Sequence, residues 1–135
     1  MWEHFHHQAD IGVRGTGESI QEAFEEGAVA LMAVICDPEK VQPKEELQIT
    51  CYAQDQELLF ADWVNALIYE MATRKMLFNR FEVNIDGTKL KAKAWGEKAD
   101  PDKHETAVEV KAATYSQLAV ECQDGKWIAQ CVVDV

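Results

Sequence analysis

The sequence has no apolar run long enough to cross a membrane and no basic, apolar leader at its start. We therefore expect a cytoplasmic protein without membrane contacts. Its four cysteines, Cys36, Cys51, Cys122 and Cys131, form no Cys-x-x-Cys pair, which argues against a zinc site or a redox motif. We expect them to be small, buried residues in a reducing compartment.

Basic residues are scarce. The chain has 13 lysines and arginines against 24 aspartates and glutamates, and its net charge is −11. Affinity for nucleic acid depends on cationic contacts to phosphate, so this balance predicts no direct nucleic-acid partner. An acidic surface is better suited to docking on a basic protein.

The motifs of several enzyme classes are also missing. The sequence has no glycine-rich phosphate loop and no serine or cysteine nucleophile with a base beside it. Its acidic residues follow no pattern specific to hydrolysis. No active site can be built from these residues, so the sequence itself predicts no enzyme.

With 135 residues, 47% of them apolar, the chain predicts one domain over residues 1–135 with a substantial core. Apolar residues recur at helical spacing over residues 19–35, where Ser19 and Glu22 form a capping box. Asp55 is placed to cap a second helix, whose apolar stripe is typical of a core-facing surface.

Strands are predicted at residues 2–7 and 47–53 and in two hairpins with Asp-Gly turns. A turn at residues 86–87 would place Val83 opposite Leu90. A turn at residues 124–125 would place Cys122 opposite Trp127, Val120 opposite Ala129 and Leu118 opposite Cys131.

This order of elements predicts an α+β fold. Two helices would pack on one face of a largely antiparallel sheet of about six to seven strands, with room for a parallel pair.

Two aspartates interrupt apolar stretches near the chain ends. Asp10 lies within residues 8–13, and Asp134 lies within residues 131–135. A carboxylate there must stay exposed, be paired, or bind a cation, because burying it unpaired costs several kcal/mol. Both could be exposed strand ends that never meet. If their strands are neighbours, they converge with the carboxylate of Val135 into an oxygen-donor set for a hard divalent cation.

Four segments resemble motifs of the archease family, in the same order and across nearly the whole chain. They are His7-Gln8-Ala9-Asp10-Ile11-Gly12, Leu58-Leu59-Phe60-Ala61-Asp62-Trp63-Val64-Asn65, Glu109-Val110-Lys111-Ala112-Ala113-Thr114-Tyr115 and Trp127-Ile128-Ala129-Gln130-Cys131-Val132-Val133-Asp134-Val135. Gln8 departs from the family, which usually has threonine there. The departure removes a hydroxyl beside the proposed site and leaves the acidic residue in place.

The resemblance implies an accessory protein that activates an RtcB-type RNA ligase by promoting its guanylylation and multiple turnover. It makes Asp10 and Asp134 the metal ligands, with Val135 as a further oxygen donor. Ca²⁺ is the expected cation, and Mg²⁺ or Mn²⁺ are alternatives.

Three further residues are candidates for this function. Lys111 lies in a family motif and could reach a carboxylate or a phosphate, although a solvated lysine that protects a strand edge is the alternative. His7 opens the first motif and could orient Asp10. His104 lies in a polar loop that could contact a partner. His4 and His6 share a strand face but lack a third ligand, so a structural role is expected for them.

Two other functions remain open. The same family resemblance is compatible with a general chaperone or modulator of an RNA-modifying enzyme, such as a tRNA methyltransferase. The carboxylates are also compatible with a small metal-dependent hydrolase, which would turn over a phosphoester alone.

Overall fold

A computed structural model describes all 135 residues. The chain forms two main helices and eight strands, with the α+β class confirmed. The elements, in chain order, are β1 (Trp2–His7), β2 (Asp10–Gly17), α1 (Ile20–Ile35), a 3₁₀ turn (Pro38–Lys40), β3 (Glu45–Tyr52), α2 (Gln56–Arg74), β4 (Met76–Asp86), β5 (Lys89–Lys98), the short helix α3 (Pro101–His104), β6 (Ala112–Ala113), β7 (Ala119–Gln123) and β8 (Lys126–Asp134). No helix is long and apolar enough to span a bilayer.

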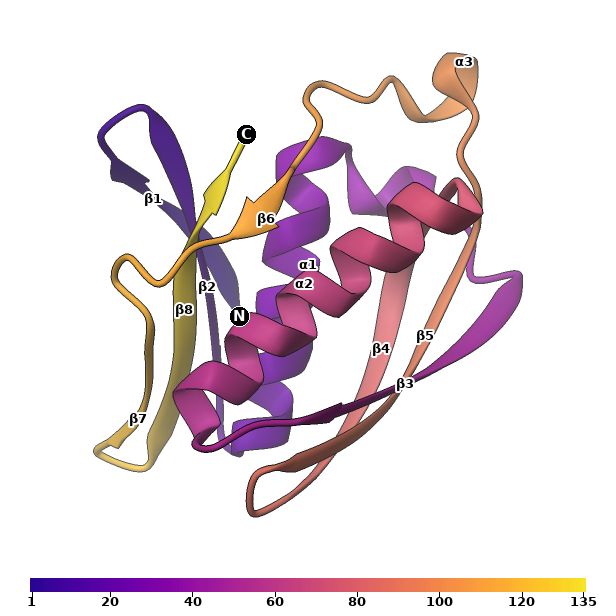
Figure 1. Ribbon diagram of the computed structural model, residues 1–135. Coiled ribbons are helices and arrows are strands. Elements are labelled where there is room, and N and C mark those ends of the chain that lie inside the picture. Colours follow the sequence, from indigo (N-terminus) through magenta and orange to yellow (C-terminus); the bar gives the residue numbers. More distant parts are fainter.

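The strands form two sheets, where one was expected. One sheet has the order β1-β2-β8-β6, with β7 also paired to β8, and the other has the order β3-β5-β4. Every strand pair is antiparallel, so the parallel pair that the sequence allowed is not formed. Helix α1 lies between the two sheets, and α2 crosses beside it (Figure 1). Because α1 contacts both sheets, it has apolar side chains on more than one side.

Helix α1 begins and ends as the sequence predicts. The Ser19 side chain accepts a hydrogen bond from the Glu22 backbone N–H at 3.1 Å, which caps the first turn. Nine of its sixteen residues are buried, and Phe24 and Leu31 among them are fully enclosed. An apolar surface this wide is typical of a helix covered on more than one side.

Helix α2 is capped in the same way, because Asp55 accepts from the Leu58 N–H at 2.8 Å. Its Trp63 is fully buried, and the indole N–H donates to the Phe24 carbonyl at 3.1 Å. This bond satisfies the one polar group of the indole and joins the two helices.

Of the two predicted hairpins, the second has the expected register, with Cys122 opposite Trp127 and Val120 opposite Ala129. Leu118, expected opposite Cys131, precedes the first residue of β7. In the first hairpin Val83 lies opposite Ala92 and not Leu90. The turn is formed there by Gly87 and Thr88, because Gly87 adopts a φ of +62° at the first turn position. A two-residue shift leaves every side chain on its predicted face.

Strand β2, which contains three glycines, was not among the strands predicted from the sequence. In the structure these glycines allow close packing. A Cβ on Gly15 would lie 2.1 Å from the Ala23 carbonyl oxygen and 2.2 Å from the Gly27 nitrogen in α1. A Cβ on Gly12 would lie 2.3 Å from the Phe5 ring on the other face. Glycine in a strand interior often marks such a close approach.

Three of the four cysteines are buried, as expected from the sequence, and one is not. Cys36, Cys51 and Cys131 are buried, and Cys122 is exposed. Burial raises the pKa of the Cys131 thiol to about 12, so this residue behaves as a small apolar side chain.

Candidate functional site

The strand that carries Asp10 pairs directly with the last strand. In the β2–β8 ladder, Ile11 lies opposite Val133. Asp10 is the first residue of β2 and Asp134 the last residue of β8, so one further step in this register places the two aspartates opposite each other. The condition for their convergence is met.

The same row of residues continues across the sheet on both sides. His7 lies opposite Asp10 in the β1–β2 hairpin, and Ala112 lies opposite Asp134 in the β6–β8 pair. Gln8, in the turn between β1 and β2, has a φ of +57°, which is uncommon for a residue with a side chain. His7 and Asp10 are half-buried, whereas Asp134 is exposed. The row therefore lies at an open end of the sheet.

Lys111 lies beside the last residues of the chain. Its backbone N–H donates to the Asp134 carbonyl at 2.8 Å, and its exposed side chain forms no ion pair. Figure 1 shows the C-terminus next to β6, the strand that follows Lys111. Asp10, Asp134, Val135 and Lys111 thus occupy one end of the sheet, although they come from three distant parts of the sequence.

The donor chemistry of this end suits a hard cation, but the side chains alone do not complete a site. Nowhere in the chain do three or more histidine, cysteine, aspartate or glutamate side chains gather so that they could hold a metal ion. Asp10 and Asp134 supply two carboxylates, so a cation there would need further oxygen donors, for example from Val135 or from another molecule.

His104 does not present its ring to solvent. It is only 1% exposed, and its Nδ1 accepts a hydrogen bond from the Asp100 backbone N–H at 2.8 Å. The ring proton of the neutral imidazole is therefore on Nε2, which donates to Glu97 at 3.0 Å. The polar loop around His104 stays a candidate for contact with a partner, although the ring itself is buried. His4 is also structural, since its Nε2 lies 2.8 Å from the Ala30 carbonyl oxygen.

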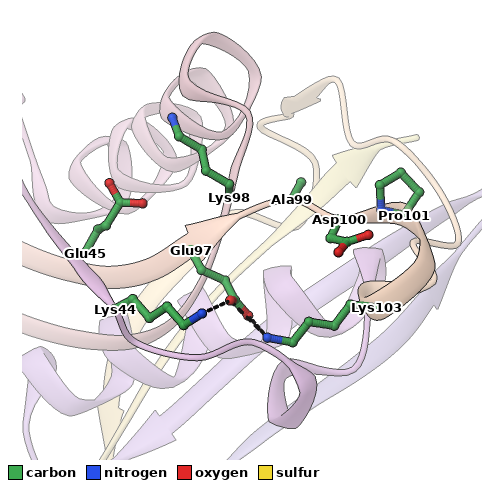
Figure 2. A pocket seen from close by; sticks show the side chains of 8 residues that line it. All are labelled: Lys44, Glu45, Glu97, Lys98, Ala99, Asp100, Pro101 and Lys103. Atoms are coloured by element: carbon green, nitrogen blue, oxygen red, sulfur yellow. Dashed lines mark hydrogen bonds and ion pairs between the residues drawn. The ribbon is translucent and has the colours of Figure 1, made fainter.

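The buried Glu97 carboxylate is the centre of an ionic cluster that also contains the partly exposed Lys103 and the exposed Lys44. Lys103 lies 2.7 Å and Lys44 3.5 Å from its carboxylate, beside a polar hollow of about 520 Å³ (Figure 2). Hydrogen bonds from Lys103 and then from His104 lower the pKa of Glu97 to about 2. The cluster fixes the start of the segment that leads to Lys111.

The lowered pKa predicts a dependence of stability on pH. Ionised Glu97 stabilises the fold above its usual pKa of 4.5, and this contribution is lost as the pH falls from there towards 2. We expect Glu97→Gln to be less stable than the wild type at neutral pH and to show a weaker pH dependence in that window. Urea unfolding of both proteins across this range tests it, and parallel curves would contradict it.

The sequence profile of the Archease protein family matches residues 2–135. The chain belongs to the archease family. It is 45% identical to the protein archease of Pyrococcus abyssi, over 99% of this chain and 98% of the relative. It is 43% identical to the protein archease of Sulfurisphaera tokodaii, over 99% and 98% of the two chains.

Two solved structures share the fold. The solution structure of protein 1598 from Methanobacterium thermoautotrophicum has a TM-score of 0.87 and 32% identity, covering 99% of this chain and 98% of that one. The crystal structure of an archease from Thermotoga maritima, described as a possible chaperone, has a TM-score of 0.66 and 25% identity, covering 100% and 98%. This chain therefore shares its overall fold with both of these solved structures.

One residue of an archease motif has a structural role that the sequence did not indicate. The Asn65 side-chain oxygen accepts from the Ala113 backbone N–H at 2.8 Å. This bond ties β6 to α2 and thereby positions the segment that carries Lys111. The available signal was an amide between apolar residues on a helix, since such a group needs a partner when it is partly buried.

Proposed function

We propose that this archease activates an RtcB-type RNA ligase, by promoting guanylylation of the ligase from GTP and so allowing repeated turnover in tRNA splicing or RNA repair. The family resemblance supplies this role. The observation that carries the proposal is the β2–β8 pairing, which brings Asp10 and Asp134 to one open end beside Lys111. An exposed set of charged groups of this kind is suited to contact with a partner's site.

The carboxylates of Asp10, Asp134 and Val135 would hold a divalent cation, Ca²⁺ first and Mg²⁺ or Mn²⁺ as alternatives. When bound, the cation would supply positive charge for phosphate oxygens in the partner's cleft. Because Asp134 is exposed, the site is open on one side to a ligand from another molecule.

Lys111 would supply an ammonium group next to that position, for a phosphate or for a carboxylate of the partner. His7, opposite Asp10 in the β1–β2 hairpin, would orient the Asp10 carboxylate. His104 would contribute indirectly, by holding in place the start of the segment that ends at Lys111, because its ring is buried there.

The net charge of −11 supports docking on a protein rather than competition for its RNA. An RNA ligase needs a basic cleft for the phosphate backbone, and an acidic partner is attracted to such a surface. The ligase would be met in the cytoplasm.

Ligation by a purified RtcB-type ligase, with and without this protein, tests the proposal. Without it, we expect product in an amount similar to that of the ligase, which is a single turnover. With it, GTP and a divalent cation, we expect many turnovers. Equal turnover numbers in the two reactions would contradict the proposal.

A chaperone role is the second candidate, favoured by one feature. A hollow of about 290 Å³, lined mainly by hydrophobic residues, lies beside the exposed Val108, between the end of α2 and the segment before β6. Suppression of the aggregation of an unrelated RNA-modifying enzyme would support this role, whereas selective action on the ligase would support the first.

A further inference from the structure

The outer face of the three-stranded sheet differs from the rest of this acidic protein. Along the central strand β5, the inward-facing Leu90, Ala92 and Ala94 are buried, and the alternate residues point outward. These outward residues are Lys89, Lys91, Lys93 and Trp95. We name this surface the lysine face and define it by these four residues together with Tyr52 of β3 and Arg80 of β4.

The cations of the lysine face are not neutralised by ion pairs. Lys91 lies between two uncharged neighbours, Thr50 of β3 and Asn84 of β4. None of Lys89, Lys91, Lys93 and Arg80 lies within ion-pair distance of a carboxylate. The nearby acidic residues are on the two edge strands, where Asp86 lies opposite Lys89 and Glu82 lies opposite Lys93. The four cations of the lysine face therefore form no ion pair, and they outnumber by one the carboxylates of Glu46, Glu82 and Asp86 on the same side of the sheet.

Two aromatic rings lie among these cations. Tyr52 is 68% exposed, and the Lys89 ammonium lies 5.5 Å from its ring centroid. The Arg80 guanidinium lies 4.8 Å from the centroid of the half-buried Trp95 ring. Exposing the apolar surface of an aromatic ring to water is unfavourable. A large exposed aromatic side chain among cations is therefore typical of a recognition surface.

We propose that the lysine face binds single-stranded nucleic acid. Proteins that bind single strands combine a cationic track for the phosphates with aromatic rings on which bases stack, and an open sheet is a common platform for this. The lysines repeat at every second residue, about 6.7 Å apart along the strand, which forms such a track.

This inference revises the expectation from net charge. The value of −11 averages over the whole surface, whereas binding depends on the local field, and four of the 13 basic residues lie on this one face. The alternative ligand, an acidic protein segment, would use the lysines but would have no need of Tyr52. The inference does not depend on ligase activation, since the lysine face and the Asp10 site belong to different sheets.

Fluorescence anisotropy of a short labelled oligouridine tests the inference with the protein alone, in EDTA and without ligase. We expect binding that weakens with salt. If three to four phosphates are contacted, the slope of log K against log salt should be about −2 to −3. Absence of binding at about 50 mM salt would overturn the inference.

Variants separate the two components of the surface. The double variant Lys91→Gln and Lys93→Gln should weaken binding about tenfold at low salt and flatten the salt slope. Tyr52→Ala should weaken it about fivefold or more through lost stacking. Lys126→Gln, at an exposed position in the other sheet, is the matched control and should change little. Melting curves of all variants check the fold.

Binding of a labelled oligoglutamate tests the alternative ligand, an acidic protein segment. The oligoglutamate should bind much more weakly than the oligouridine and should be insensitive to Tyr52→Ala. If it binds as tightly, or if Tyr52→Ala leaves RNA binding unchanged, the lysine face is a site for acidic protein segments and the inference is wrong.

Discussion

Asp10→Asn and Lys111→Ala are each expected to abolish multiple turnover of the partner ligase while leaving the fold intact. Asp10 would lose a cation-binding carboxylate and Lys111 a cation beside it, and neither side chain belongs to the core. Surface substitutions away from special contacts usually change stability by within about 0.5 kcal/mol. Turnover numbers and thermal melting of the two variants provide the measurement.

The matched controls are Asp62→Asn, on the exposed side of α2, and Lys126→Ala. Both should support turnover at the wild-type level. A Ca²⁺ titration by calorimetry should in addition show weaker binding to Asp10→Asn than to Asp62→Asn. If both site variants still drive repeated ligation, the open end of the β2–β8 pair is not the functional site.

Gly15→Ala should be strongly destabilising, with an expected loss of about 3 kcal/mol or more in the free energy of unfolding. The added methyl would meet backbone atoms of Ala23 and Gly27, and backbone cannot rotate away as a flexible side chain can. Helix α1 would have to move off β2, and the contacts on its other side would be disturbed too. Urea unfolding measures the loss.

Gly87→Ala is the control for this prediction. Gly87 has a φ of +62° but open space around its Cβ position, so alanine there should cost only about 1 kcal/mol of backbone strain. If the two variants lose equal stability, the close approach of α1 to β2 is not what requires glycine at position 15.

The helices could be predicted from the sequence because their signals are local. Ser19 and Asp55 cap the turns that directly follow them, and the apolar spacing of each helix lies within one segment. The second hairpin was equally local, since positive φ values at Asp124 and Gly125 define the turn and therefore the register.

The division into two sheets could not be predicted, because it depends on contacts between distant segments. The glycines of β2 weaken a strand pattern, and only the presence of α1 against Gly15 explains them. The burial of His104 is similar: its neighbours in sequence are polar, and its partner Glu97 lies in another element. At the candidate site, Asp10 and Asp134 stood out by their apolar surroundings, but their proximity followed from the pairing of β2 with β8.

This pairing also has a consequence for synthesis on the ribosome. The edge of β2 that faces the middle of its sheet has no partner until β8, the last strand made, has left the exit tunnel. Until then β2 exposes unpaired backbone groups, which favour pairing with other chains. The three-stranded sheet and both helices can assemble earlier. We expect the nascent chain to remain incompletely folded, and the residues at the open end to remain apart, until β8 has emerged from the ribosome.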